Sequence, residues 1–172
     1  IAHGIEYLAL RYFNAAGADA GARFGEDHDP ETHLIPLVLE AAAGLRLSVT
    51  INGTEYPTED GTCIRDYVHV TDLATAHVSG LQRLMAGTLA SQAVNLGTGE
   101  GVSVREVINA VRKITGRDFT IAEGLPREGD PPRLVARVER AADLLNWEPE
   151  HSRLSNIVET AWNWLEKRRP TG

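Results

Sequence analysis

Two arginines and two other polar side chains have the types and positions of a site for an anion and a sugar. Asn14 follows an apolar run, Arg65 stands inside the extended segment CIRDYVHV, and Arg127 and Asp130 share the segment REGD. A guanidinium group matches the oxygens of a diphosphate bidentately, and a carboxylate accepts hydrogen bonds from ribose hydroxyls. Taken singly, each residue is more often part of a surface salt bridge, so it is their combination that indicates a binding site.

Other chemistries find no support in the sequence. None of the four tyrosines is followed four residues later by a lysine, the pair that lets a phenolate act as a base. The glycines of residues 97–101 do not fit the spacing G-x-G-x-x-G, so we interpret GTGEG as a tight turn between a strand and a helix. The six histidines lack the spacing of metal-ligand motifs, and no G-x-S-x-G is present. We therefore expect no catalytic residue and no metal site.

Bulk properties limit the possible partners. The 172 residues are 42% hydrophobic and 24% charged, which is ordinary for one globular domain. A net charge of -7 disfavours nucleic-acid binding. The single cysteine, Cys63, excludes an intramolecular disulfide, and no apolar run is long enough to cross a bilayer, so a cytoplasmic protein without membrane contact is expected. The chain begins at Ile1 without methionine, which we interpret as a piece of a longer protein.

Strands that alternate with helices predict an α/β chain. The apolar run 5–13 has the composition of a strand buried on both faces of a parallel sheet. Small residues dominate the following loop, 14–25, which is either a place where a ligand approaches the backbone or simply irregular. Further strands are expected at 47–53, 63–70, 93–97 and 119–123, and helices at 34–44, from a cap at 71–72 to 85, from a capping box at Ser103 and Glu106 to 116, at 139–145 and at 155–167.

Five segments resemble, in the same order, those of UDP-glucose 4-epimerases, which belong to the extended short-chain dehydrogenase/reductase family. The resemblance runs almost end to end, and the central block YPTEDGTCIRDYVHVTDLA is the most specific part, because the wider family shares the second half of the block but rarely the first. The segments are LRYFNAAGA (10–18), HLIP (33–36), the central block (56–74), NLGTGEG (95–101) and REGDPP (127–132).

The resemblance implies the C-terminal part of a Rossmann-type NAD-binding fold plus the small mixed α/β substrate-binding domain. Residues 1–172 are then the UDP-sugar-binding portion, which includes the last Rossmann strands at about 5–13 and 93–97, while the N-terminal NAD-binding portion is absent. In the family, bound NAD takes hydride from C4 of the sugar and returns it to the other face, so UDP-glucose and UDP-galactose interconvert. The tyrosine and lysine of that reaction lie upstream of Ile1, so we expect this chain to be inactive alone and its parent to be a homodimer.

Matching the family's motifs position by position also implies site residues. Tyr12 and Phe13 are expected beside the nicotinamide end of NAD. Arg65 and Arg127 are expected on the diphosphate, and Asp130 on the ribose. The full set of substrate-binding positions is Asn14, His33, Leu34, Val49, Thr50, Asn52, Arg65, Arg127, Asp130 and Leu134.

Three positions depart from the common pattern of the family. His33 stands where many members carry Asn, and Asn52 stands where an aromatic residue is common. Leu134 occupies the position that helps decide whether an N-acetylated sugar fits. Two alternatives therefore stay open, which are a 4-epimerase for another UDP-sugar (pentose, uronate or N-acetylhexosamine) and a noncatalytic UDP-sugar-binding module.

Overall fold

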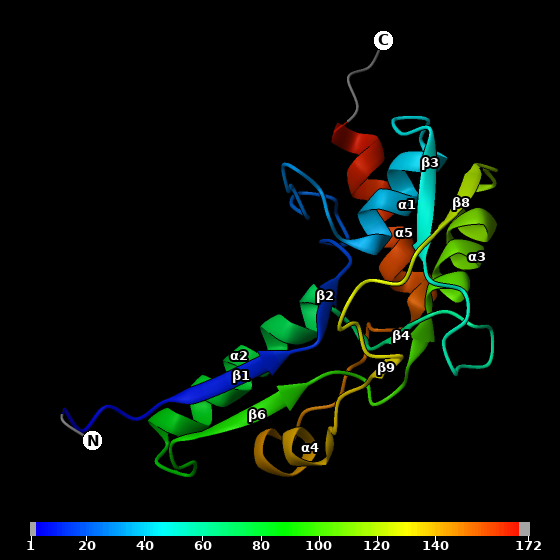
Figure 1. Cartoon of the computed structure of the whole chain (residues 1–172). Helices are drawn as coiled ribbons and strands as arrows, with labels where there is room; N and C mark the ends of the chain where they lie inside the picture. Colours follow the sequence, from blue (N-terminus) through cyan, green and yellow to red (C-terminus); the bar gives the residue numbers. More distant parts are fainter. Residues whose placement is uncertain (1–2, 169–172) are drawn as a thin grey trace.

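The structure is a computed structural model that describes residues 3–168, and it confirms the predicted α/β class. The chain forms an elongated lobe that carries the N-terminus and a second, more compact lobe (Figure 1). In chain order, the elements are β1 (Leu8–Tyr12), β2 (Asn14–Ala16), α1 (Leu34–Ala42), β3 (Ser48–Asn52), β4 (Ile64–Arg65), β5 (Tyr67–His69), α2 (Val70–Met85), β6 (Gln92–Leu96), β7 (Val102–Ser103), α3 (Val104–Thr115), β8 (Thr120–Gly124), β9 (Arg133–Leu134), α4 (Glu139–Leu145) and α5 (Leu154–Arg168).

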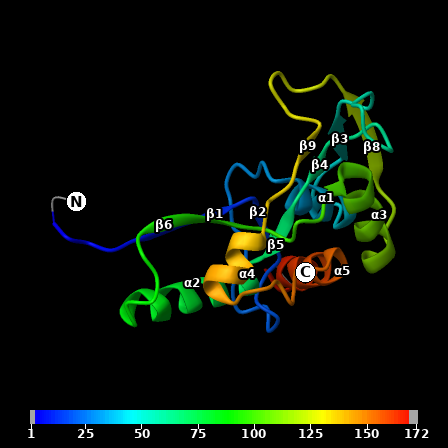
Figure 2. The same ribbon diagram turned by 90° about the horizontal axis from the view of Figure 1, so that it is seen from below.

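The elongated lobe consists of the parallel pair β1–β6 with helices on one face. Figure 2 shows α2 and α4 on the same side of the two strands. Leu8 and Leu10 point toward a core that α2, α4 and β6 complete, whereas Ala9 and Arg11 are exposed. The prediction that this strand is buried on both faces is therefore wrong for the described chain, because helices cover only one face of the pair.

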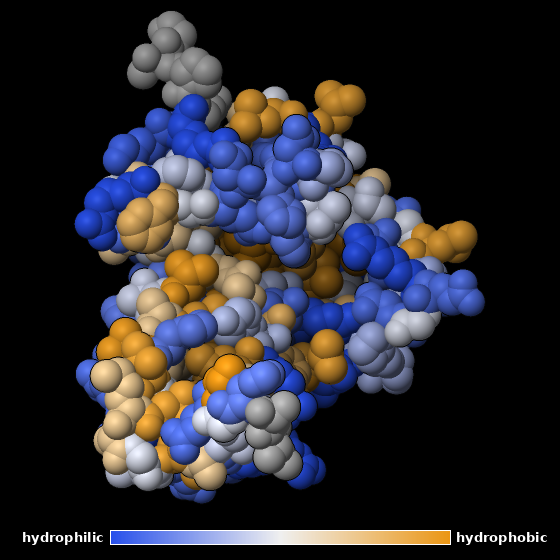
Figure 3. Space-filling model, turned by 90° about the vertical axis from the view of Figure 1, so that its left-hand side faces the viewer, coloured by the Kyte–Doolittle hydropathy of each residue, from blue (hydrophilic) through white to orange (hydrophobic). Residues whose placement is uncertain are grey.

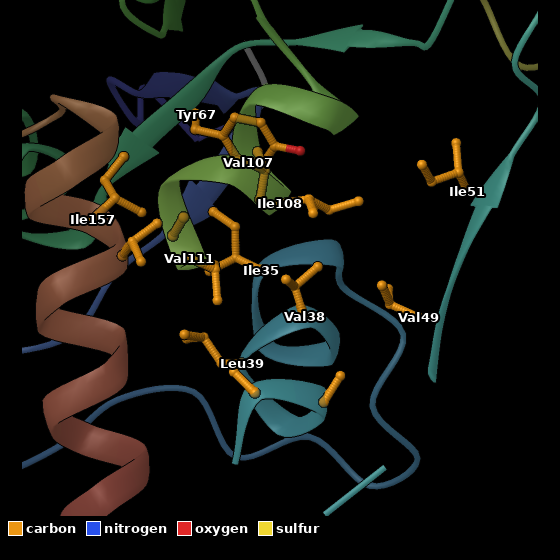
Figure 4. Close-up of a cluster of buried hydrophobic side chains, with 14 residues drawn as sticks. Ile35, Val38, Leu39, Val49, Ile51, Tyr67, Val107, Ile108, Val111 and Ile157 are labelled. Atoms are coloured by element: carbon orange, nitrogen blue, oxygen red, sulfur yellow. The ribbon is translucent and has the colours of Figure 1, made fainter. Parts of the chain in front are cut away.

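The compact lobe has the larger hydrophobic core. Helices α1, α3 and α5 pack against one another, and the parallel pair β3–β8 closes the lobe beside α1 and α3 (Figure 1). Figure 4 shows aliphatic side chains from all three helices and from β3 meeting at the centre. The fully buried members include Val38, Leu39, Ile51, Ile108 and Ile157.

The two lobes meet where the first strand changes partner. β1 pairs with β6 as far as Tyr12, and β2 then pairs in parallel with β5. Between them, the amide of Asn14 donates to the carbonyl oxygen of Asp66 at 3.0 Å. The expected strand 5–13 is the shorter β1, and β2 occupies the first residues of the expected loop 14–25. The small residues of that loop are partly explained by packing, because a Cβ on Gly17 would lie 2.5 Å from the ring of His69.

The first residues of α3 and α2 test two predicted helix caps. The capping box of Ser103 and Glu106 is confirmed, and α3 ends at Gly116 in the left-handed conformation that glycine favours. The cap expected at Thr71 and Asp72 is wrong, because α2 begins at Val70 and His69 caps it.

The cap of α2 requires a neutral imidazole. The amide of Thr71 donates to Nδ1 of His69 at 3.0 Å, so Nδ1 carries no proton and Nε2 donates to Oγ1 of Thr160 at 3.0 Å. Burial lowers the pKa of His69, and His151 adds to this effect while Asp72 opposes it. Protonation would therefore remove the acceptor that starts the helix.

Replacing His69 by Asn should reduce the sensitivity of the fold to acid. A pKa that is lower in the folded than in the unfolded state gives stability that is present above the ordinary histidine value of about 6.5 and is lost as the pH falls through the folded value, at up to about 1.4 kcal/mol per pH unit. Asn keeps a capping oxygen but does not titrate. Urea unfolding between neutral and mildly acidic pH measures this slope, and equal slopes for the two proteins would contradict the account.

Candidate functional site

A cavity of about 1440 Å³ lies between the strand ends, the start of α1 and the loop that follows β8. Figure 3 shows this side of the molecule hollowed, with hydrophobic residues at the floor. Every predicted site residue except Leu134 lines it. The predicted residues that do so are Tyr12, Phe13, Asn14, His33, Leu34, Val49, Thr50, Asn52, Arg65, Arg127 and Asp130.

Leu134 lies elsewhere. It is half-exposed in β9, where it is the register partner of Arg65 in β4, and it is not among the residues that line the cavity. In this structure, Leu134 therefore sets no boundary of the cavity.

Arg65 and Asp130 lie in the cavity as an ion pair. Nη2 of Arg65 bonds Oδ1 of Asp130, and Nη1 donates to the carbonyl oxygens of Ile64 at 2.7 Å and Pro131 at 2.9 Å. The Arg65 side chain is 14% exposed. These bonds fix the guanidinium in one orientation, and they neutralise the carboxylate that was expected to face a ribose.

Arg127 reaches the same cavity from the loop after β8. In the amide orientation that satisfies both side chains, Oδ1 of Asn52 accepts from Nε and Nη2 of Arg127 at 3.3 and 3.2 Å. Asn52 is the last residue of β3, and its register partner Gly124 ends β8. The two strand ends thus bring a second guanidinium to the same cavity, and within residues 3–168 it forms no ion pair with a carboxylate.

Asn14 is held by the segment that carries Arg65. Its Nδ2 and its backbone amide both donate to the carbonyl oxygen of Asp66, at 2.9 and 3.0 Å. The Asp66 side chain points the other way and is fully buried. Its carboxylate accepts from the amides of Thr98, Gly99 and Ala136 at 2.8 to 3.1 Å, and from the Thr98 hydroxyl at 2.7 Å.

This network explains the glycine-rich turn after β6. The amides of the turn surround a carboxylate of the protein itself, and a Cβ on Gly97 would lie 2.5 Å from Oδ2 of Asp66. The interpretation of GTGEG as a structural turn is confirmed. Sequence reasoning missed Asp66 as its partner, although a carboxylate inside the apolar run CIRDYVHV was a signal of buried hydrogen bonding.

Comparisons with known proteins show the family to which the chain belongs. Residues 2–97 match the model of the NAD dependent epimerase/dehydratase family. The chain belongs to that family. A UDP-glucose 4-epimerase of Halalkalibacterium halodurans is 50% identical over 99% of this chain and 51% of its own length.

Solved structures of epimerases in this family have the same fold. The UDP-glucose 4-epimerase of Brucella ovis in complex with NAD superposes with a TM-score of 0.90 at 49% identity, over 94% of this chain and 50% of the other. The enzyme of Bifidobacterium longum in complex with NAD+ and UDP gives 0.86 at 35% identity, over 94% of this chain and 48% of the other. The chain therefore spans about half the length of the epimerase/dehydratase relatives that it matches.

The cavity of this epimerase/dehydratase chain offers no tyrosine suited to act as a base. Tyr67 lines it, but burial raises the pKa of the phenol to about 12, so it stays protonated at neutral pH. The hydroxyl of Tyr12 is 2.8 Å from Nε2 of His77, whose Nδ1 lies 2.7 Å from the carbonyl oxygen of Leu73. Tyr12 is therefore held by His77, Tyr67 keeps its proton, and neither lysine of residues 3–168 lines the cavity.

One group of side chains was missed by the spacing argument. Glu26, His28, Glu31 and His33 offer ligand atoms that lie within 4.8 Å of one another, at the edge of the same cavity. The argument from the sequence considered the spacing of ligands along a helix, so it gave no signal of side chains that meet because a loop folds back on itself.

Replacing Asp66 by Asn should destabilise this epimerase/dehydratase chain by about 2–3 kcal/mol, since an amide presents a donor to groups that are themselves donors and leaves them unpaired in a buried site. Urea denaturation measures the free energy of unfolding. Asp118→Asn is the matched control, because that side chain is 88% exposed and its loss should cost less than about 1 kcal/mol. Equal losses for the two variants would refute the role given to Asp66.

Proposed function

We propose that this chain is the UDP-sugar-binding part of a UDP-glucose 4-epimerase, an enzyme that interconverts UDP-glucose and UDP-galactose with NAD. The observation that carries the proposal is the position of Arg65 and Arg127 in one cavity with Asn14. Relatives named UDP-glucose 4-epimerase that are about half identical to the chain support it.

The proposed roles follow from charge and polarity. Arg127, which forms no ion pair with a carboxylate in residues 3–168, receives the diphosphate, while Arg65 offers a second, pre-oriented guanidinium in the same cavity. Leu34 and Val49 form an apolar wall suited to the flat face of a uracil ring. Asn14 keeps its amide oxygen for a sugar hydroxyl, since its Nδ2 is already bonded to Asp66.

The remaining substrate positions fit the same arrangement. His33 precedes Leu34 at the start of α1, and Thr50 follows Val49 in β3. Both residues line the cavity. Asn52 acts through Arg127, whose orientation it fixes. These residues would hold the nucleotide and would not take part in the chemistry.

Tyr12 and Phe13 fit the nicotinamide end of NAD, because they place aromatic surface where β1 ends at the cavity. NAD, when bound, supplies the hydride acceptor and donor for C4 of the sugar. Tyr12 is fixed by His77, so its ring is available for packing in one orientation. The base and the glycine fingerprint are proposed to belong to another part of the protein, since no tyrosine here has a lysine four residues later.

The proposal also covers the domain to which the strands belong, the oligomeric state of the whole enzyme and its cellular compartment. β1 and β6 form the last strands of the NAD-binding domain, and the whole enzyme works as a cytoplasmic homodimer. The single cysteine, which is buried, is consistent with a reducing compartment. Among residues 3–168, none of the helices has the length and apolar character that a membrane span needs.

UDP should bind to the chain, and Arg127→Ala should weaken this binding by roughly tenfold or more, because a bidentate contact between guanidinium and phosphate is lost. Isothermal titration calorimetry measures the affinity. Arg117→Ala, which removes an exposed arginine from the loop after α3, is the matched control and should leave it unchanged. A chain that does not bind UDP, or two variants with equal affinity, would contradict the proposed site.

Mixing the chain with NAD and UDP-galactose should yield no UDP-glucose, because the catalytic tyrosine and lysine are lacking. Chromatography of the nucleotide sugars measures the product, and turnover by the chain would refute this assignment. The full-length protein assayed against UDP-hexoses, UDP-pentoses, UDP-uronates and N-acetylated UDP-hexosamines separates the epimerase alternatives. A full-length protein that binds UDP-sugars and converts none would be the noncatalytic module.

A further inference from the structure

Four potential metal ligands gather in the segment between β2 and α1. Glu26, His28, Glu31 and His33 stand within eight residues of sequence, and their ligand atoms all lie within 4.8 Å of one another. The rings of the two histidines have centroids 5.0 Å apart. Two imidazole nitrogens and two carboxylate oxygens thus face a common point.

The two carboxylates of this cluster have the same imidazole as their ion-pair partner. Nδ1 of His33 lies 2.5 Å from Oε1 of Glu26 and 3.3 Å from Oε1 of Glu31, and these are the ion pairs that both glutamates form in the described part of the chain. Arg168 is close by but pairs with Asp27. The Glu31 side chain is only 8% exposed. Two carboxylates, one of them buried, therefore share one imidazole, an arrangement that a divalent cation would stabilise.

The backbone that carries these ligands is fixed at both ends. Nε1 of Trp164 and Nη1 of Arg168, both in α5, donate to the carbonyl oxygen of Glu26 at 2.8 and 3.3 Å. At the other end, His33 is the N-cap residue of α1, but its side chain makes no capping bond. The amides of Thr32 and His33 donate to Oε1 of Glu31 at 2.6 and 2.7 Å. The ligands are therefore held before any ion arrives, and the His33 ring is not used by the helix.

We propose that Glu26, His28, Glu31 and His33 bind one divalent transition-metal ion of the zinc class. Imidazole and carboxylate ligands together suit Zn²⁺, Co²⁺ and Ni²⁺, whereas Mg²⁺ and Ca²⁺ prefer oxygen ligands alone. Bonds of about 2.0–2.2 Å place tetrahedral ligand atoms roughly 3.3–3.6 Å apart. The ligand atoms now lie within 4.8 Å of one another, so they would have to move closer together around an ion.

Zinc binding to the chain tests the proposal without any nucleotide or turnover. Calorimetric titration of chelator-treated chain with Zn²⁺ should show one site that His28→Ala weakens by roughly tenfold or more, since the loss of even an outer-shell partner commonly costs that much. The double variant His28→Ala/His33→Ala should lose the site. His3→Ala, which removes an exposed histidine at the N-terminal end of the other lobe, is the matched control and should bind like the parent.

Two further measurements distinguish a specific metal site from an unfolded variant and from unselective binding of divalent ions. Co²⁺ should give the strong visible absorption of a four-coordinate ion in the parent chain and in His3→Ala, but not in the double variant, while circular dichroism confirms that all three are folded. Mg²⁺ should not compete with Zn²⁺. A parent that binds no Zn²⁺, a folded double variant with the parent's affinity, or competition by Mg²⁺ at equal concentration would each overturn the proposal. Because UDP is absent from these titrations, their failure leaves the proposed nucleotide site to be judged separately.

Discussion

The buried carboxylate of Asp66 is the interaction on which the arrangement of the cavity depends. It is fully buried, and its oxygens receive three backbone amides and one hydroxyl from the turn after β6 and from residue 136. Its backbone carbonyl receives both donors of Asn14. One residue thus ties together the end of β6, the point where the first strand changes partner, and the strand that carries Arg65. A buried carboxylate is tolerated there because the three amides and the hydroxyl that contact it all donate hydrogen bonds.

The two arginines of the cavity differ in the partners that hold them. Arg65 is bonded to Asp130 and to two carbonyl oxygens, so its guanidinium is held in one orientation and its charge is balanced by the carboxylate. Arg127 is oriented by a neutral amide and keeps its full charge for an anion. Such prior orientation lowers the entropy cost of binding, because neither guanidinium must be immobilised when the ligand arrives. An acidic chain can in this way present a local site for a diphosphate.

The sequence predicted the helices and strands better than the contacts between residues that are distant in the chain. Local signals placed α3 correctly, because its capping box and its terminal glycine act within the helix itself. The exposure of Ala9 and Arg11 depends on which elements cover β1, and the orientation of the His69 ring depends on Thr160, 91 residues away. No local pattern reveals either of these contacts. The pairing of Arg65 with Asp130 spans 65 residues and required the fold. The four metal-ligand candidates were close in sequence, but their meeting depends on how residues 26–33 are anchored to α5.

The central claim is that Arg65 and Arg127 face one uridine diphosphate. A crystal structure of the chain grown with UDP tests it most directly, because it locates the two phosphates relative to the two guanidinium groups. The account predicts the diphosphate between Arg127 and Arg65 with the uracil against Leu34 and Val49. A nucleotide bound outside this cavity, or phosphates in contact with neither arginine, would contradict it.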